Sequence, residues 1–154
     1  MSPPAALDEH DPSGGDSVRV VEVEIPSDVR LIERVVELVR RECEVMGFTA
    51  RQIRLNVPVA LTEAVSNAIL RGNRDDPAKH VHVRAEVRHE RLVVEIEDEG
   101  DGFDVDASCV DPTTPDQIGR EEGRGLYLMR KLMDTVERVD APRGSVVRMT
   151  LHRE

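Results

Sequence analysis

The stretch "LTEAVSNAILRGN", residues 61–73, has the apolar spacing of a helix that carries two polar side chains on one side. Glu63 and Asn67 are four residues apart, so in a helix they lie one turn from each other on the same side. Their neighbours are the alanines and aliphatic residues that a core-facing surface requires, namely Leu61, Ala64, Val65, Ala68 and Ile69. The pair therefore marks either the solvated edge of a helix or one wall of a site.

The segments around this stretch predict the fold class. Alternation of apolar and polar residues predicts strands at residues 17–26, 80–89, 91–98, 135–141 and 145–154. Apolar residues at helical spacing predict helices at residues 27–47, from about 49 to 71, and at 125–134. An interior proline costs about 3 kcal/mol, so we expect the middle helix to break or kink near Asn56–Pro58. The order of elements predicts an α+β sandwich with a mixed, largely antiparallel sheet and helices on one face.

Domain organisation follows from length and composition. A chain of 154 residues is most often one domain. The first sixteen residues mix Pro, Gly, Ser and acidic residues without periodicity. They contain four acidic residues and no Lys or Arg. We expect a disordered tail at residues 1–16 and a single folded domain at residues 17–154.

Charge and composition exclude several classes of protein. The formal net charge is −10, and with no Trp, one Tyr and two Phe the chain has neither a basic stripe nor a stacking platform for nucleic acid. No apolar run approaches the about 20 residues of a membrane span, and no secretory signal is recognisable. Two cysteines, Cys43 and Cys109, are too few for a disulfide framework. We expect a cytoplasmic protein that binds neither nucleic acid nor membrane.

A second motif, Asp98-x-Gly100-x-Gly102, comes directly after a predicted strand. Glycines there allow turns and let a ligand approach the backbone closely. A carboxylate at the end of the strand can accept a hydrogen bond from an amino group such as that of adenine. The motif alone is equally compatible with an ordinary acidic turn, and it lacks the third glycine and the helix of a dinucleotide fingerprint.

A third motif precedes the last predicted helix, after a stretch of more than twenty residues without a strand or helix pattern. Gly123-x-Gly125 leads into this helix, where free backbone N–H groups and the positive end of the dipole can hold phosphates. Arg120 and Arg124 can add local positive charge. Alone, a Gly-x-Gly before a helix can also be a permissive start. A fourth piece, around Ser145, begins the last strand.

Three histidines near one predicted strand raise the question of a metal site. His80 and His82 share a face, and His89 lies close by at the turn. No Cys or acidic cluster joins them at ligand spacing, so the sequence does not favour such a site.

Together, the order and spacing of these pieces resemble the GHKL ATP-binding fold and, within it, the anti-sigma factor serine/threonine kinases of bacterial partner-switching systems. The resemblance covers residues 18–153. It implies that Asn67 binds the Mg²⁺ that bridges the ATP phosphates and that Glu63 is the catalytic base. It also implies an ATP lid at residues 104–122, hinged at Gly123 and Gly125.

The same resemblance implies roles at the other end of the site. Asp98 corresponds to the adenine-binding aspartate, with Gly100 and Gly102 shaping that end of the pocket. Ser145 stands where the family commonly has a Thr near the adenine. Arg71 departs from the His that many relatives have there, and it can serve either as a phosphate contact or as a solvated arginine at the helix end.

The resemblance implies a kinase that transfers phosphate from ATP to a Ser or Thr of a STAS-domain anti-anti-sigma protein. A sigma factor would be the second partner, and a homodimer is plausible in this family. The alternative is an ATP-binding module that sequesters a partner without phosphorylating it. Retention of both Glu63 and Asn67 favours the kinase, because a module that only binds has no need of a base.

Overall fold

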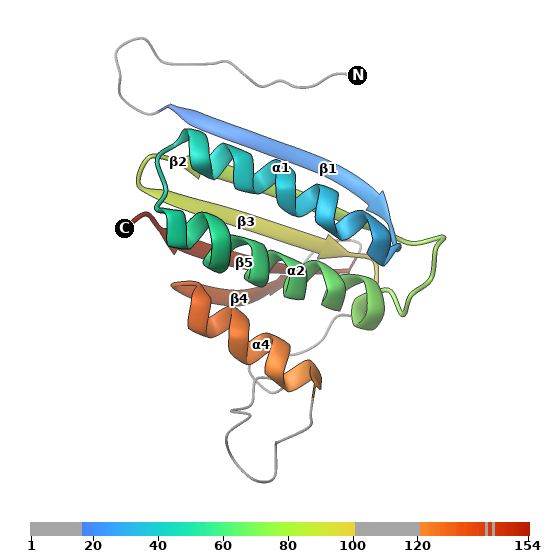
Figure 1. Ribbon diagram of the computed structural model, residues 1–154. Coiled ribbons are helices and arrows are strands. Elements are labelled where there is room, and N and C mark those ends of the chain that lie inside the picture. The colour runs from blue at the N-terminus through green and yellow to red at the C-terminus, as the bar shows by residue number, and fades with distance from the viewer. Residues whose placement is uncertain (1–16, 101–120, 141, 143) are drawn as a thin grey trace, which may run out of the picture.

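Five strands form one antiparallel sheet in the part of the chain that this computed structural model describes, which is residues 17–100, 121–140, 142 and 144–154. The strands are β1 (Val18–Pro26), β2 (His80–Arg88), β3 (Arg91–Asp98), β4 (Thr135–Asp140) and β5 (Ser145–His152). They lie in the order β1-β2-β3-β5-β4 (Figure 1). The expected α+β fold is confirmed. The sheet is antiparallel throughout rather than mixed, because β5 turns back from β4 to pair with β3.

The helices cover one face of the sheet, as expected. α1 (Ile32–Val45) lies over β1 and β2, α2 (Val57–Asn67) runs along β3 and β5, and α4 (Glu121–Leu132) packs beside α2 near β4 (Figure 1). Three shorter turns adjoin them: the 3-10 turn η1 (Val29–Leu31) and the π-helical turns η2 (Gln52–Asn56) and η3 (Ala68–Gly72). No helix among the described residues is long and apolar enough to cross a membrane.

The core lies between the sheet and the helices because alternate strand residues face it. In β2 the side chains of Val81, Val83, Ala85 and Val87 are fully buried, and every second residue of β3 and β5 is buried in the same way. The helices contribute matching aliphatic residues, such as Val39 of α1. Such burial is the main stabilising term of the domain.

The opposite face of the sheet carries charged side chains that pair across strands. Arg148 Nε lies 2.7 Å from Glu95 Oε2, and His82 Nε2 lies 3.0 Å from Glu22 Oε2. Within β2, Arg84 also pairs with Glu86 on this face. Exposed pairs of this kind contribute only about 0–1 kcal/mol each, so this face is solvated rather than a second core.

The helix does not break at Asn56–Pro58, so of the two expected outcomes only a kink stays a prediction. The chain is helical without interruption from residue 50 to residue 72. A wide turn precedes the proline: the N–H of Val57 donates to the carbonyl of Gln52, five residues back. Pro58 follows this wide turn as the second residue of α2, and it has no N–H to donate to the preceding turn. A change of hydrogen-bonding pattern therefore accommodates the ring without ending the helix.

α4 also begins earlier than the sequence predicts, at Glu121 instead of residue 125, so Gly123 and Gly125 lie inside it. Glycine disfavours helix by about 1 kcal/mol relative to alanine, which placed the predicted start after Gly123. Tertiary packing outweighs this cost, because Leu126 and Met129 of the same helix are fully buried.

Candidate functional site

Glu63 and Asn67 meet the first turns of α4, as shown by their distances from Gly125. A Cβ atom placed on Gly125 would lie 2.6 Å from Glu63 Oε1 and 3.8 Å from Asn67 Nδ2. The two side chains therefore reach the same point on the neighbouring helix, as their spacing predicts. The first distance is shorter than a van der Waals contact, so any larger residue at position 125 would displace the Glu63 carboxylate.

Asn67 carries an unsatisfied polar atom at this point. Its side chain is 9% exposed, and its Nδ2 is buried without a hydrogen-bond partner among the described residues. A buried donor without a partner costs about 1–3 kcal/mol, a cost that an acceptor on a bound ligand removes. The other amide atom, Oδ1, is the kind of oxygen that binds hard cations such as Mg²⁺. The Asn67 amide is thus suited to a ligand that brings both anionic oxygen and a cation.

Asp98 ends β3 as a buried carboxylate, with 2% of its surface exposed. Its Oδ1 accepts from the backbone N–H of Gly100 at 2.9 Å, and its Oδ2 accepts from the hydroxyl of Ser145 at 3.2 Å. The structure therefore brings three predicted site residues together. The backbone N–H of Ser145 also hydrogen-bonds this carboxylate. A carboxylate has about four acceptor positions and these donors use three, so capacity for a donor on a ligand remains.

Burial changes the titration of this group. Desolvation raises the pKa of Asp98 above the ordinary 3.8, against the opposing effect of the hydrogen bonds from Gly100 and Ser145. Because the folded-state pKa is raised, the ionised carboxylate costs folding free energy at neutral pH. A charged, buried acceptor that lowers stability is the kind of group that a binding site retains for its ligand.

The end of η3 lies against Asp98, and this contact joins the two halves of the site. A Cβ on Gly72 would lie 2.3 Å from Asp98 Oδ2, and a Cβ on Gly100 would lie 1.5 Å from the carbonyl oxygen of Gly72. Only glycine permits such close approach of the two backbones. One continuous helical segment therefore carries Glu63 and Asn67 along its length and meets Asp98 at its end.

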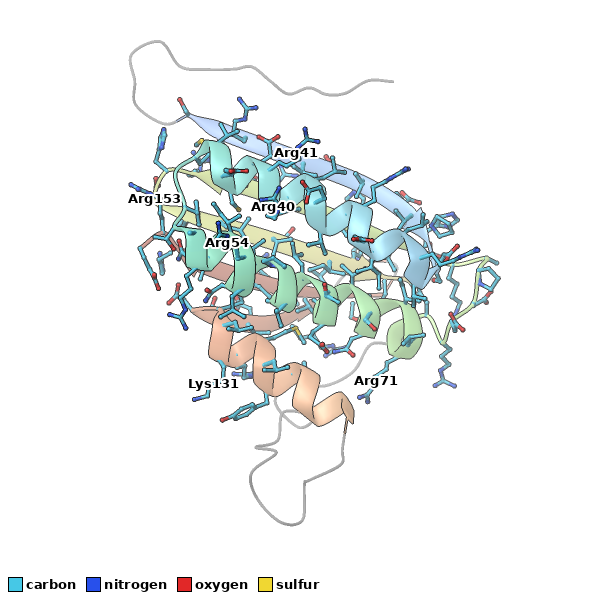
Figure 2. All side chains as sticks on the ribbon, in the orientation of Figure 1. Arg40, Arg41, Arg54, Arg71, Lys131 and Arg153 are labelled. Atoms are coloured by element: carbon cyan, nitrogen blue, oxygen red, sulfur yellow. The ribbon has the colours of Figure 1, made fainter. Side chains whose placement is uncertain are left out.

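The remaining predicted residues divide into two groups. Arg71 lies in η3, and Figure 2 shows its side chain extending on the side where α4 lies. Gly102, nearly all of the predicted lid at residues 104–122, and the side chain of Arg124 lie outside the described residues. Gly123 lies in the first turn of α4, where backbone N–H groups have no intrahelical partner.

Two residues at this end of the site were missed from the sequence. Gly72 and Asn73 were interpreted only as a helix stop, although Gly72 contacts Asp98 and Asn73 is fully buried. The one available signal was Gly72 itself, a glycine five residues after Asn67 at the end of the predicted helix. Its distance from Asp98 depends on tertiary packing, which that signal does not reveal.

The histidines and the described cysteine have ordinary surroundings. His80 lies 3.9 Å from Glu99, and His82 pairs with Glu22. Among the described residues, no three His, Cys, Asp or Glu side chains are arranged to hold a metal ion. Burial raises the pKa of the Cys43 thiol to about 12, so this cysteine is unreactive at neutral pH.

Comparison with known proteins identifies the family of this chain. Residues 25–151 match the family model of the histidine kinase-like ATPase domain. The chain is 36% identical to the serine-protein kinase RsbW of Bacillus velezensis over 140 residues, which cover 87% of this chain and 86% of the relative. It is 41% identical to RsbW of Bacillus subtilis over 111 residues, or 68% of each chain. It is also 29% identical to the anti-sigma F factor of Oceanobacillus iheyensis over 61% of this chain and 66% of that one.

Solved structures show the same fold at lower identity. The crystal structure of the RsbU and RsbW domains of a Mycobacterium tuberculosis protein matches 88% of this chain with a TM-score of 0.61 and 15% identity, and this chain spans 33% of that one. The mycobacterial sensor histidine kinase MprB matches 87% of this chain and 99% of its own, with a TM-score of 0.50 and 16% identity. The chain therefore belongs to the histidine kinase-like ATPase family and, within it, to the anti-sigma serine-protein kinases of the RsbW type.

Proposed function

We propose that this protein uses ATP and Mg²⁺ to phosphorylate a Ser or Thr of a STAS-domain anti-anti-sigma protein, and that it binds an RNA polymerase sigma factor once that partner is phosphorylated. Membership of the anti-sigma kinase family supports the ATP-dependent kinase and the two kinds of partner. The STAS domain of the substrate, the metal and the individual residue roles are the parts of this proposal that go beyond the family.

One observation carries the assignment of the site. The segment from α2 to η3 bears Glu63 and Asn67, and its last residue, Gly72, lies against the carboxylate of Asp98. A single helical wall thus joins an acceptor for an amino group to a pair of groups that can bind phosphate, a cation and a proton. ATP has two matching ends: an amino group on the adenine, and phosphates that bind a cation.

At the phosphate end, Asn67 would hold the metal and the phosphates. Its orphaned Nδ2 supplies a donor for a phosphate oxygen, and its Oδ1 supplies a ligand for Mg²⁺. Mg²⁺ usually keeps several water ligands and takes few from protein, so a single amide oxygen is a fitting donor set. The N–H groups in the first turn of α4, near Gly123, which have no intrahelical partner, and the side chains of Arg71 and Arg124 would add phosphate contacts.

Glu63 would act on the substrate hydroxyl. When bound, ATP with Mg²⁺ supplies the phosphoryl group and the positive charge that the transfer needs. The half-buried Glu63 carboxylate would orient the attacking Ser or Thr and accept its proton. Because Glu63 Oε1 lies close to the backbone of Gly125, movement at the start of α4 would control access to this base.

At the base end, Asp98 would accept a hydrogen bond from the exocyclic amine of adenine. Gly100 and Ser145 hold the two carboxylate oxygens in place, and their hydrogen bonds leave acceptor capacity on the carboxylate. Gly102 would shape the same end of the pocket. The raised pKa of Asp98 supports this role, because pairing with a donor offsets the cost of burying the charge.

The organisation of the chain follows the same proposal. Residues 17–154 would form the kinase domain and residues 1–16 a disordered tail. We include a homodimer as the assembly, on the family resemblance alone. ATP and sigma factors are present in the bacterial cytoplasm, which we propose as its location. The net charge of −10 supports the absence of nucleic acid from the set of partners.

The direct test is transfer of label from [γ-³²P]ATP with Mg²⁺ to a purified STAS-domain protein encoded near this gene. Label on a Ser or Thr of the partner, absent when the Glu63→Gln variant replaces the wild type, would support both the kinase and its base. A stable complex and normal ATP binding without label would instead favour a module that sequesters its partner.

A further inference from the structure

Asn73 joins three elements beside the peptide bond that follows Asp98. It comes directly after η3 and is fully buried. Its Nδ2 donates to Ser27 Oγ at 3.0 Å and to the carbonyl oxygen of His80 at 3.0 Å. Its Oδ1 accepts from the backbone N–H of Glu99 at 2.8 Å. The end of β1, the start of β2 and the end of β3 therefore meet on one side chain.

The orientation of this amide is fixed by its partners. The carbonyl of His80 can only accept and the N–H of Glu99 can only donate, so the oxygen and nitrogen of Asn73 cannot be exchanged. Ser27 gives its own hydroxyl proton to the carbonyl of Lys79 at 2.8 Å and therefore accepts from Asn73. Both N–H donors and the oxygen acceptor of the amide are thus hydrogen-bonded, and these bonds hold the Asn73 side chain in one orientation.

Asn73 provides the hydrogen-bond acceptor for the first N–H beyond the strand pairing. The pairing of β3 with β5 stops at Asp98 and Ser145, so Glu99 is the first residue beyond it. Its N–H is held by Asn73, and the next N–H along the chain, that of Gly100, bonds to Asp98 Oδ1 at 2.9 Å. Asn73 therefore fixes the peptide that precedes the Gly100 N–H, and the Gly100 N–H in turn holds Asp98 Oδ1, while the hydroxyl of Ser145 holds Oδ2.

We propose that Asn73 is a positioning residue for base selection, which holds the Asp98 carboxylate so that the site accepts an amino-purine nucleotide and rejects an oxo-purine one. Adenine carries an exocyclic amine that donates, whereas guanine carries an oxygen that accepts at the same ring position. A fixed carboxylate oxygen binds the first and repels the second. A carboxylate free to turn away loses this selectivity. The inference rests on the proposed function, in which Asp98 receives adenine.

The test is the ratio of dissociation constants for non-hydrolysable GTP and ATP analogues, measured by calorimetry on the full chain. Asn73→Ala should reduce the preference for the ATP analogue by roughly five- to tenfold, the size of one net hydrogen bond. Ser27→Ala is the matched control. It removes a partner of the same Asn73 amide and lowers stability similarly, but it leaves the bond to Glu99 in place, so its ratio should stay within about twofold of wild type.

A ratio unchanged in Asn73→Ala, despite a loss of stability like that of Ser27→Ala, would overturn the proposal and leave Asn73 with a structural role only. If Asn73→Ala does not fold, Asn73→Ser takes its place: its shorter side chain does not reach the Glu99 N–H, so the preference should fall as in Asn73→Ala, and an unchanged ratio would overturn the proposal. Asn73→Asp keeps an acceptor for the Glu99 N–H. Asn73→Asp should retain the wild-type ratio, and loss of the ratio in this variant would contradict the proposal.

Asp98→Asn in the same series distinguishes a failure of the role of Asn73 from a failure of the assignment of adenine to Asp98. If it removes the base preference while Asn73→Ala does not, only the role of Asn73 fails. If Asp98→Asn itself leaves the ratio unchanged, the assignment of adenine to Asp98 fails, whatever Asn73 does.

Discussion

Replacement of Asp98 by asparagine should weaken ATP binding and, without nucleotide, stabilise the fold at neutral pH. Asparagine has nearly the same shape and can keep the hydrogen bonds with the N–H of Gly100 and the hydroxyl of Ser145, although the backbone N–H of Ser145 also donates to the carboxylate. Its Oδ1 would accept from the N–H of Gly100, now at 2.9 Å from the carboxylate, and its Nδ2 would donate to the hydroxyl of Ser145, now at 3.2 Å. The substitution therefore removes the charge and one acceptor while leaving the packing intact.

The binding loss follows from the hydrogen bond that disappears. With its oxygen held by Gly100, the new amide places its NH₂ group where the carboxylate oxygen accepted. Because this group and the adenine amine are both donors, no hydrogen bond forms between them. A hydrogen bond to a charged group is worth about 1.5–3 kcal/mol, which corresponds to an affinity about 10- to 150-fold lower. Isothermal titration calorimetry with ATP and Mg²⁺ measures this loss directly.

The stability gain has a defined pH dependence. Burial raises the pKa of Asp98 above 3.8, so the ionised group destabilises the folded wild type above that raised pKa, and the cost falls as protonation sets in at lower pH. The free energy of unfolding of Asp98→Asn should exceed that of wild type most at neutral pH, and the difference should shrink as the pH approaches 4. Urea denaturation at a series of pH values measures it.

Glu99→Gln is the matched control, since it removes one negative charge at the adjacent position. Its amide oxygen can still accept from the backbone N–H of His80, as the carboxylate does at 3.1 Å. ATP affinity should change little in this variant. An Asp98→Asn protein that binds ATP as wild type does, or one that is less stable than wild type at every pH, would refute the reasoning.

Three further predictions concern the rest of the site. Glu63→Gln should reduce phosphate transfer at least 100-fold, within the range for loss of a general base, while ATP affinity measured by calorimetry stays the same; a variant of near wild-type activity would remove Glu63 as the base. Gly100→Ala places a methyl group 1.5 Å from the carbonyl of Gly72, so the backbones must separate. ATP binding should fall by more than tenfold, and unchanged affinity would show that this contact is not part of the site. EDTA should abolish transfer, with activity restored by Mg²⁺, while Asn67→Ala should need more Mg²⁺ for half-maximal rate; an unchanged requirement would exclude Asn67 as the ligand.

Much of the fold was predictable because local pattern and tertiary structure agree. The strict alternation in β2 and β3 predicts strands with one buried face, and the valines at positions 81, 83 and 87 are fully buried there. The spacing of Glu63 and Asn67 correctly predicts that they reach one point, because four residues make about one helical turn.

The errors arose where packing outweighs local propensity. Pro58 and Gly123 both argue against a helix at their positions, yet each lies in one, since a π-helical turn accommodates the proline and burial of Leu126 and Met129 holds α4. The contact of Gly72 with Asp98 joins residues twenty-six positions apart, and no local pattern specifies it.

The central claim is that Asp98 and Asn67 bind opposite ends of one nucleotide. A crystal structure with a non-hydrolysable ATP analogue tests it most directly, with Mn²⁺ in place of Mg²⁺ so that anomalous scattering locates the metal. We predict the adenine amine within hydrogen-bond distance of Asp98 and the metal bound to Asn67 Oδ1 beside the phosphates. Adenine bound away from Asp98, or a metal without contact to Asn67, would contradict this account.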